Sequence, residues 1–495
     1  ETISEAWKTV LLNQFHDILP GSSIAEVYED AEKDYAGVRR ALQNLKDHSL
    51  RSLARRIDTR GEGDALIVWN SLGWKRDDVA ITPLPSADSS GWSVLDPDGR
   101  EVATQPVILE SGAAGLLFEA SDLPPMGYSV FRLVKRAPRV RGNLIARRNH
   151  LENRFFEVAL SKTGSISRIF DKLNNREVLP EGSSANRLVL FEDFPASADA
   201  WDIDFNFEEK FQEIGDTESV TVTERGPVRA TVRVVKRTKN SRITQDISIW
   251  ASLSRIDFAT EVEWYEKHKL LKASFPVNVL SRIATYEIQF GAIERPTHRS
   301  GPVERARFEV PGHRWIDLSE ADYGVSLMND CKYGFDVCEN NMRISLLRGS
   351  VSPDPHADEG QHLFLYSLYP HRGDWRSALT TRRAYELNAP LSCWIEKAHG
   401  GTHPRRWSFV SVDSSDIVID TVKKAEDSDA IIIRVYESHG ARGEATLQFG
   451  KVPLNVTECD LMEEHDVDVP VKDSSVQLMM KPWEIKTLKA TFSNG

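Results

Sequence analysis

Two different hydrophobic patterns divide the chain. Up to about residue 58 the apolar positions recur every three or four residues, which predicts two helices. The first ends near Gln14, and the second begins at Ser23, where Ser23 and Glu26 form a capping-box pattern. The second helix carries an apolar stripe from Ile24 to Ile57, which needs long neighbours. We therefore expect a third helix from a preceding segment, and a stripe that this chain covers incompletely.

From residue 61 onward the chain shows short alternating or β-branched runs separated by Gly, Pro, Asn and Asp, which predicts strands. About 430 residues of this texture are too many for a single sandwich. We predict a mainly β protein: a short amino-terminal helical pair, part of a three-helix bundle, followed by several β-sandwich domains including a large central super-sandwich. The predicted units are the partial helical bundle at 1–58, a small β-sandwich at 61–140, the large β-sandwich at 143–398 and a carboxy-terminal β domain at 405–495.

The composition narrows the kinds of partner. The 62 Lys and Arg residues face 74 Asp and Glu residues, and the net charge of −12 comes without the clustered basic face of a nucleic-acid-binding protein. The sequence contains no run of about 18 apolar residues, which is the length that a membrane-spanning helix would need. Four cysteines do not make a disulfide framework, so we expect buried free thiols and a reducing, cytoplasmic compartment.

The chemically informative segment is the predicted interhelical turn from Leu11 to Ser23, Leu-Leu-Asn-Gln-Phe-His-Asp-Ile-Leu-Pro-Gly-Ser-Ser. It sets the imidazole of His16 beside the carboxylate of Asp17, ahead of a Pro20-Gly21 turn signal. Imidazole is the commonest metal ligand, and a neighbouring carboxylate can fix its tautomer or bind sugar hydroxyls. By spacing alone a structural histidine is the better interpretation, because zinc sites need three or four ligands. We expect both side chains to point away from the β-sandwiches.

The segment from Trp7 to Tyr35, with Asn-Gln-Phe-His-Asp-Ile-Leu-Pro-Gly-Ser-Ser-Ile at its centre, resembles the middle region of glycoside hydrolase family 38 α-mannosidases, above all their cytosolic and bacterial branch. Motifs that recur in that family in the same order extend the likeness over essentially the whole chain. They include Phe191-Glu192-Asp193, Asp199-Ala200-Trp201-Asp202-Ile203-Asp204, His313-Arg314-Trp315 and Pro482-Trp483-Glu484-Ile485-Lys486. One departure is Ala198, where the family pattern leads us to expect Trp.

The resemblance implies a retaining, zinc-dependent exo-α-mannosidase acting on α-mannosyl oligosaccharides. In the family, the histidine at the position of His16 is a zinc ligand, and the aspartate at the position of Asp17 contacts the terminal mannose. The other ligands, the nucleophile and the acid/base carboxylate belong to an amino-terminal catalytic barrel. We therefore expect no catalytic residue in this chain, which alone would be inactive and would not hold zinc. The resemblance also implies a galactose mutarotase-like fold for residues 143–398.

Two further groups could contact sugar. Trp201 and Asp202 combine an indole face with a hydroxyl acceptor, although a buried Trp beside acids that cap a turn explains them equally well. The loop Gly373-Asp374-Trp375 offers the same combination with less support. Two alternatives stand for the whole chain: a stand-alone carbohydrate-binding protein, and a structural module that forms a homo-oligomer.

Overall fold

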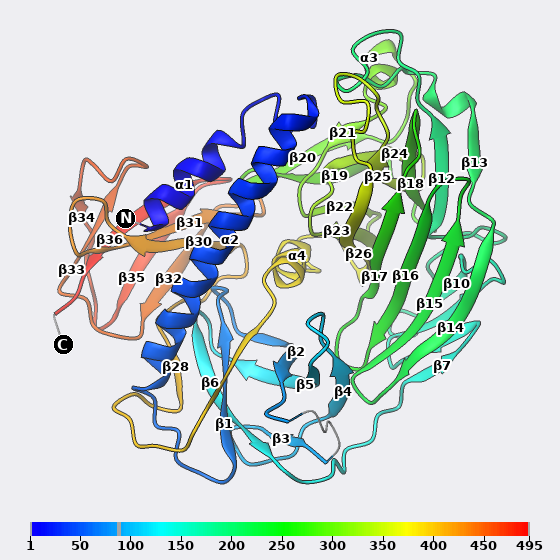
Figure 1. Cartoon of the computed structure of the whole chain (residues 1–495). Helices are drawn as coiled ribbons and strands as arrows, with labels where there is room; N and C mark the ends of the chain where they lie inside the picture. The colour runs from blue at the N-terminus through cyan, green and yellow to red at the C-terminus, as the bar shows by residue number, and fades with distance from the viewer. Residues whose placement is uncertain (1, 87–90, 494–495) are drawn as a thin grey trace.

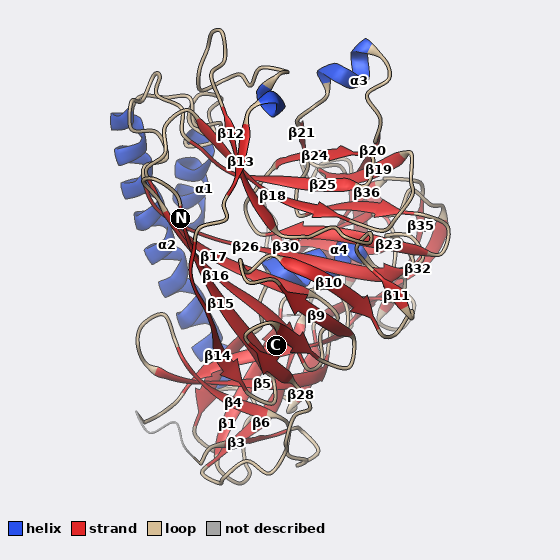
Figure 2. Ribbon diagram, turned by 90° about the vertical axis from the view of Figure 1, so that its right-hand side faces the viewer, coloured by secondary structure: helices blue, strands red, loops and turns tan. Residues whose placement is uncertain are grey.

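The structure is a computed structural model that describes residues 2–86 and 91–493. It confirms the predicted fold class, because a helical pair, α1 (Thr2–Leu12) and α2 (Ala25–Ala54), precedes a series of antiparallel sheets (Figure 1). Figure 2 shows that both helices lie at one side of the molecule, outside the sheets. Within the described ranges, no helix combines the length and apolar character that a membrane crossing requires.

The start of α2 corrects one prediction. The helix begins at Ala25, with Ile24 as its N-cap residue and no side-chain capping bond. The predicted capping box of Ser23 and Glu26 is therefore wrong. The Ser23 hydroxyl donates instead to the backbone carbonyl of Asp17, at 2.7 Å.

The helical pair buries few of its own side chains. Among the described residues of α1 only Ala6 is buried, and α2 buries Ala31, Val38 and Ala54. Ala54 packs with Ile57 against the small sandwich. The prediction that the apolar stripe from Ile24 to Ile57 is incompletely covered is confirmed, because Ile24, Leu42 and Leu53 are exposed. We call the following side chains, each more than half exposed, the α1 patch: Ile3, Trp7, Leu11, Leu12, Phe15 and Leu19.

The small sandwich consists of two sheets around a core that includes Leu66, Phe118 and Phe131. One sheet contains β27 (Ser392–Glu396), β1 (Asp64–Asn70), β6 (Gly127–Val134) and β28 (Arg406–Ser408), with β3 (Ser93–Leu95) also paired to β6. The other contains β2 (Arg76–Pro83), β5 (Ala114–Leu123) and β4 (Thr104–Ile108). Strands β27 and β28 follow the large sandwich in sequence, so the chain returns to the small sandwich after leaving it.

The large sandwich has one continuous core, in which Ile247, Phe258, Trp264 and Phe275 are fully buried. Its long sheet runs through β14 (Thr217–Arg225), β15 (Arg229–Arg237), β16 (Arg242–Trp250), β17 (Ile256–Trp264), β26 (Gly360–Arg372), β23 (Tyr323–Asn329), β22 (Trp315–Ser319), β19 (Ile283–Ile288) and β20 (Gly291–Pro296). A second sheet runs through β13 (Phe211–Glu213), β12 (Arg187–Glu192), β18 (Lys269–Pro276), β25 (Asn341–Arg348), β24 (Gly334–Cys338) and β21 (Val310–Pro311). A third runs through β11 (Arg176–Glu177), β10 (Ile166–Asp171), β9 (Phe156–Leu160), β8 (His150–Glu152) and β7 (Ile145–Arg147). Short helices lie in the connections: η1 (Phe207–Glu209), α3 (Pro302–Ala306) and α4 (Thr380–Asn388).

The carboxy-terminal domain is a sandwich with a core that includes Val410, Leu447 and Leu488. One sheet contains β29 (Val410–Val412), β32 (Gly443–Phe449) and β35 (Ser475–Met480). The other contains β30 (Ile417–Lys424), β31 (Ile431–Glu437), β36 (Ile485–Thr491), β33 (Asn455–Cys459) and β34 (Val467–Asp468).

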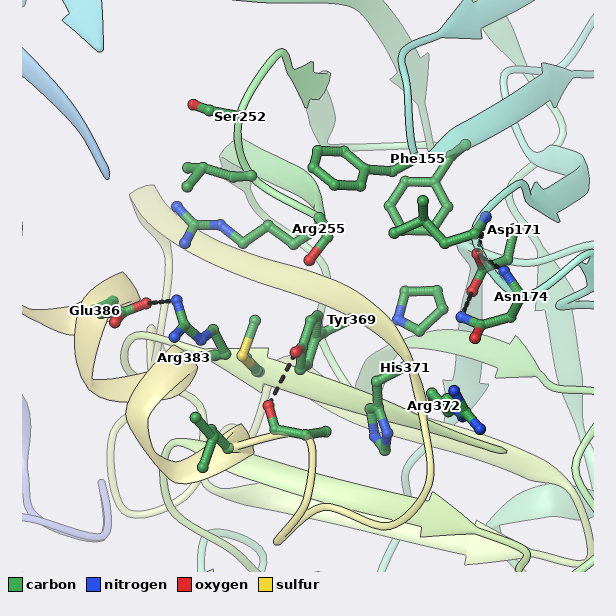
Figure 3. A pocket seen from close by; sticks show the side chains of 18 of the residues that line it. Phe155, Asp171, Asn174, Ser252, Arg255, Tyr369, His371, Arg372, Arg383 and Glu386 are labelled. Atoms are coloured by element: carbon green, nitrogen blue, oxygen red, sulfur yellow. Dashed lines mark hydrogen bonds and ion pairs between the residues drawn. The ribbon is translucent and has the colours of Figure 1, made fainter. Parts of the chain in front are cut away.

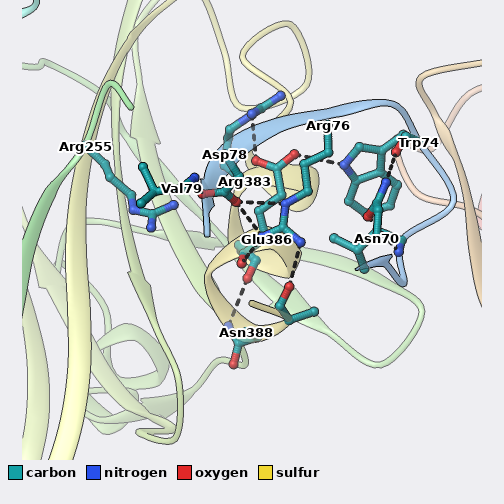
Figure 4. A network of polar contacts seen from close by, with 12 residues as sticks. Asn70, Trp74, Arg76, Asp78, Val79, Arg255, Arg383, Glu386 and Asn388 are labelled. Carbon is teal, nitrogen blue, oxygen red and sulfur yellow. Dashed lines mark hydrogen bonds and ion pairs between the residues drawn. The ribbon is translucent and has the colours of Figure 1, made fainter. Parts of the chain in front are cut away.

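A buried polar network joins the small sandwich to α4 (Figure 4). Arg76 is almost fully buried, and its Nε donates to Asp78 Oδ2 at 2.8 Å. Its Nη1 and Nη2 donate to the carbonyls of Ala389 and Glu386 at 2.6 and 2.7 Å, at the carboxy-terminal end of α4. A cation at that end of a helix is stabilised by the helix dipole. Trp74 adds a bond from its Nε1 to Glu386 Oε1 at 2.9 Å.

Candidate functional site

The turn between the two helices is held by hydrogen bonds on both sides of Asp17. Three hydroxyls donate to its backbone carbonyl, from Ser22 at 3.4 Å, Ser23 at 2.7 Å and Tyr28 at 3.3 Å. Asn13 is buried and its Nδ2 donates to Asp34 Oδ2 of α2 at 3.0 Å. The turn is therefore fixed against α2. The backbone positions from which its side chains extend are fixed with it.

The His16 side chain is 79% exposed, as expected for a group that reaches outside the chain. Its Nε2 lies 3.6 Å from Asp17 Oδ2, and its ring centroid lies 4.3 Å from that of Phe15. The ring is not packed within the β-sandwiches. Its nitrogens are accessible to an external ligand.

Asp17 departs from the expectation that it would point away from the sandwiches. Its Oδ1 accepts from Trp201 Nε1 at 3.4 Å and from the Ser22 hydroxyl at 3.3 Å. Trp201 belongs to the loop that follows β12 in the large sandwich. Because Trp201 is 56% exposed, the alternative of a buried structural Trp does not hold. The structure brings together Asp17 and Trp201, two residues that the sequence singled out separately.

The loop that carries Trp201 is anchored to β25 and the segment after it. Arg348 Nε donates to the buried Asp193 carboxylate at 2.5 Å, and its Nη2 contacts the Asp202 carbonyl. Asp199 Oδ2 accepts from the backbone N–H of Val351 at 2.6 Å. Asp202 is exposed and its Oδ1 accepts from the backbone N–H of Ile203 at 2.9 Å. Asp202 therefore lies beside Trp201 without touching Asp17.

Ala198 makes the turn that presents the indole. Its φ of 54° is left-handed, and its carbonyl accepts from the backbone N–H groups of Trp201 and Asp202 at 2.8 and 3.0 Å. A non-glycine residue in this region is uncommon and costs free energy. These bonds fix the direction in which Trp201 leaves the loop.

Trp201 also lines a cavity of about 860 Å³. The Trp201 loop contributes Asp204 and Phe205 to its wall, and the segment that contains α3 contributes Arg305 and Phe308. Sequence reasoning missed the α3 segment, because its residues carry no motif or spacing that indicates a site. Only the fold brings it opposite the Trp201 loop.

Buried charges fix one wall of this cavity. Lys272 of β18 is fully buried and contacts the carboxylates of Glu309, which lines the cavity, and Asp336, the latter at 2.5 Å. Arg343 Nε donates to Asp336 Oδ1 at 2.7 Å. Burial would raise the pKa of Glu208, but Arg343, which contacts its carboxylate, holds that pKa below its ordinary value. Buried charges that are paired in this way hold the loops above the sheet.

A second cavity, of about 520 Å³, lies between the large sandwich and α4 and is shown in Figure 3. His371 lines it, and its Nε2 lies 2.8 Å from Asp317 Oδ2 and 3.1 Å from Ser326 Oγ. A catalytic triad needs the carboxylate and the hydroxyl on opposite ring nitrogens. Here both share one nitrogen, so this cluster is structural. Burial also raises the pKa of the neighbouring Glu386.

The loop at Gly373 is not a sugar platform. Trp375 is 2% exposed and packs against Trp315, with 4.9 Å between ring centroids. Asp374 accepts from the backbone N–H of Ser377 at 2.9 Å, as a turn-capping residue does. The structural alternative holds here.

No metal site is complete within the part of the chain that the structure describes, because no three His, Cys, Asp or Glu side chains come together there. His16 offers one ligand, and zinc requires more. The four cysteines are free; Cys459 is buried and Cys331 is exposed, so the expectation of buried thiols is met only in part.

The architecture of the whole chain resembles that of two solved structures from Enterococcus faecalis. The crystal structure of an α-mannosidase from Enterococcus faecalis V583 superposes with a TM-score of 0.82 at 17% identity, over 99% of this chain and 63% of that one. A second structure from Enterococcus faecalis, described as a protein in glycosyl hydrolase family 38, gives a TM-score of 0.81 at 18% identity, over 99% of this chain and 66% of that one. At these identities the likeness shows the fold.

Sequence comparison shows the family. Residues 1–53 match the alpha mannosidase middle domain, residues 151–356 the family 38 C-terminal domain, and residues 416–488 the family 38 C-terminal beta sandwich domain. The chain is 34% identical to alpha-mannosidase 2C1 of Mus musculus over 98% of its length, and 33% identical to alpha-mannosidase G of Dictyostelium discoideum, also over 98%. It spans 45% and 48% of those two relatives. The chain belongs to glycosyl hydrolase family 38. It contains the middle domain and the carboxy-terminal domains of that family.

Proposed function

We propose that this chain is part of a retaining, zinc-dependent exo-α-mannosidase that removes α-linked mannose from the non-reducing ends of oligosaccharides. The observation that carries the proposal is the fixed turn with His16 exposed beside Asp17, within the segment that matches the alpha mannosidase middle domain. The relatives named above are α-mannosidases, which supports the same activity here.

His16 would supply one zinc ligand through its exposed ring. When bound, the zinc ion would act as a template that grips hydroxyls of the mannose. Asp17 would accept hydrogen bonds from the sugar through Oδ2, because its Oδ1 already accepts from Trp201 and Ser22. Trp201 and Asp202 would border the sugar on the other side. The remaining ligands and both catalytic carboxylates would come from an amino-terminal domain.

The α1 patch would be the surface on which that domain docks. Its apolar side chains run along α1 and continue into the turn that carries the exposed His16. Docking would therefore cover the patch and bring the missing ligands to His16 in a single step. This chain alone would be inactive and would not hold zinc, and a cytoplasmic location stays a prediction.

Three variants test the proposal in an enzyme that includes the amino-terminal domain. His16→Ala should lower bound zinc and reduce kcat/KM more than about 100-fold, since loss of groups behind a ligand already costs about 10–100-fold. Asp17→Asn should keep the zinc and lower activity. The matched control is His465→Ala, because His465 is 83% exposed and its Nε2 lies 3.9 Å from Asp460 Oδ2, a pair much like His16 and Asp17. Full activity and zinc content in His16→Ala would refute the assignment.

The isolated chain provides the complementary test. With added zinc and a chromogenic α-mannoside it should show no turnover and no tightly bound metal. Turnover that survives removal of contaminating enzyme would place a complete catalytic site in these residues. Appreciable glycan affinity of the isolated chain, without turnover of the complete enzyme, would favour a stand-alone carbohydrate-binding protein.

A further inference from the structure

We propose that the 860 Å³ cavity between the Trp201 loop and α3 binds the sugars that precede the terminal mannose, on the leaving-group side of the scissile bond. The inference rests on the proposed function and adds the class of leaving group: a neutral oligosaccharide of at least two sugar units. It assigns substrate specificity to the α3 segment, which has no other role in the proposed mechanism.

The position of Trp201 connects the cavity to the proposed mannose site. Its indole nitrogen is bonded to Asp17, while its side chain also lines the cavity. A sugar held by Asp17 therefore lies one side chain away from the cavity. The next units of an oligosaccharide can continue past the indole into it.

Aromatic rings line the cavity from both sides. Trp201 and Phe205 come from one loop and Phe308 from the other, and Phe205 is 78% exposed. The Phe205 ring is therefore available for contact with a ligand in the cavity. The face of a sugar ring carries C–H groups that pack on an aromatic ring, while the hydroxyls at its rim remain free to bond.

Polar side chains with unused hydrogen-bonding atoms lie beside these rings. Asp204 Oδ2 accepts from the backbone N–H of Ala196 at 3.2 Å, and its Oδ1 has no protein partner among the described residues. Arg305 donates from Nε to the Arg299 carbonyl at 3.2 Å, while its two Nη atoms have no protein partner among the described residues. An acceptor and a donor suit sugar hydroxyls. Acids outnumber bases along the wall, where Asp202 and Glu309 join Asp204 opposite Arg305, so an anionic ligand is disfavoured.

The volume fits more than one sugar ring. Pockets for drug-sized ligands measure roughly 300–1,000 Å³, and this cavity lies at the upper end of that range. A disaccharide or trisaccharide portion can therefore occupy it. Glu309 in its wall is tied to β18 by an ion pair with the buried Lys272.

The test compares two substrates of the complete enzyme: an α-linked mannotriose and α-mannosyl fluoride, whose leaving group is a single atom. For Phe205→Ala and for Arg305→Ala, kcat/KM on the trisaccharide should fall about five- to tenfold further than on the fluoride, which corresponds to the loss of one ring contact or charged hydrogen bond. Phe211→Ala is the matched control, since Phe211 is also an exposed Phe, on β13 outside the cavity. Its ratio of the two rates should equal that of the unaltered enzyme.

Losses of equal size on both substrates, or no loss on either, would overturn the cavity assignment. A second measurement is independent of turnover: binding of a thio-linked α-mannotriose, which the enzyme cannot hydrolyse, should weaken about fivefold in Phe205→Ala. Unchanged binding would also overturn the cavity assignment. Failure of the unaltered enzyme to hydrolyse α-mannosyl fluoride would instead count against the proposed function, so the two failures are distinguishable.

Discussion

The helical pair and the large sandwich differ in how far they bury their apolar side chains. The sandwich encloses Phe258, Trp264 and many neighbours completely, whereas α1 buries only Ala6 among its described residues and exposes Trp7 and Leu11. The sandwich therefore buries its own apolar side chains, while the helices present apolar side chains that this chain leaves uncovered. The exposed His16 lies on the incomplete region. In the proposed enzyme, the zinc site would form only where the amino-terminal domain docks.

The largest expected effect tests how much the core of the large sandwich contributes to the stability of the chain. Phe258→Ala should lower the free energy of unfolding of this chain by about 3–5 kcal/mol, because it removes a fully buried ring and leaves a cavity. Leu11→Ala, in the α1 patch, should change it by less than about 0.5 kcal/mol. Urea denaturation measures both. If both variants lost the same free energy of unfolding, the two regions would not differ in how much their apolar side chains contribute to stability.

A smaller effect tests the helical side. Trp7→Ala should weaken binding between this chain and a separately expressed amino-terminal domain about tenfold, because exposed aromatic residues often dominate an interface. Isothermal titration calorimetry measures the dissociation constant. Leu280→Ala is the control, since Leu280 is strongly exposed on the large sandwich. A similar dissociation constant for the Trp7 variant and the unaltered chain would mean that the patch is not the docking surface.

The smallest effect concerns the ion pairs of Asp122 in the small sandwich. Arg406, and then Lys75, lower the pKa of Asp122 to about 2 from an ordinary value of 3.8. The folded state therefore releases this proton more easily than the unfolded state, so the stabilisation exists above pH 4 and is lost as the pH falls towards 2. Asp122 is about half exposed, and the pair should contribute less than about 1 kcal/mol. Asp122→Asn should remove that increment at pH 7 and flatten the acid side of a stability profile measured by urea denaturation.

Periodicity predicted the helical pair and the mainly β remainder, because both patterns are local. It misplaced the start of α2, because the Ser23 hydroxyl bonds to Asp17 instead of capping the helix. A capping pattern cannot show that another acceptor lies nearby. The competition is decided by the turn as a whole, which only the folded chain defines.

The candidate site was less predictable than the fold. His16 and Asp17 were identified by family resemblance, since a single histidine at no metal spacing gives no signal of its own. The bond between Trp201 and Asp17 joins residues 184 positions apart, and no local pattern encodes it. The α3 segment was missed for the same reason. Long-range proximity created both the contact and the cavity.

The return of β27 to the small sandwich has a consequence for synthesis. Strand β1 pairs with β6 on one edge and β27 on the other, with Val68 opposite Cys393 in the second pairing. Between Val134 and Ser392 lie 257 residues that must be translated first. At about 5–20 residues per second the ribosome needs roughly 13–50 s for them, during which one edge of β1 stays open on the nascent chain. An open edge of this kind can pair with a neighbouring chain. The rate of elongation through the large sandwich therefore sets how long each new molecule is at risk of aggregation.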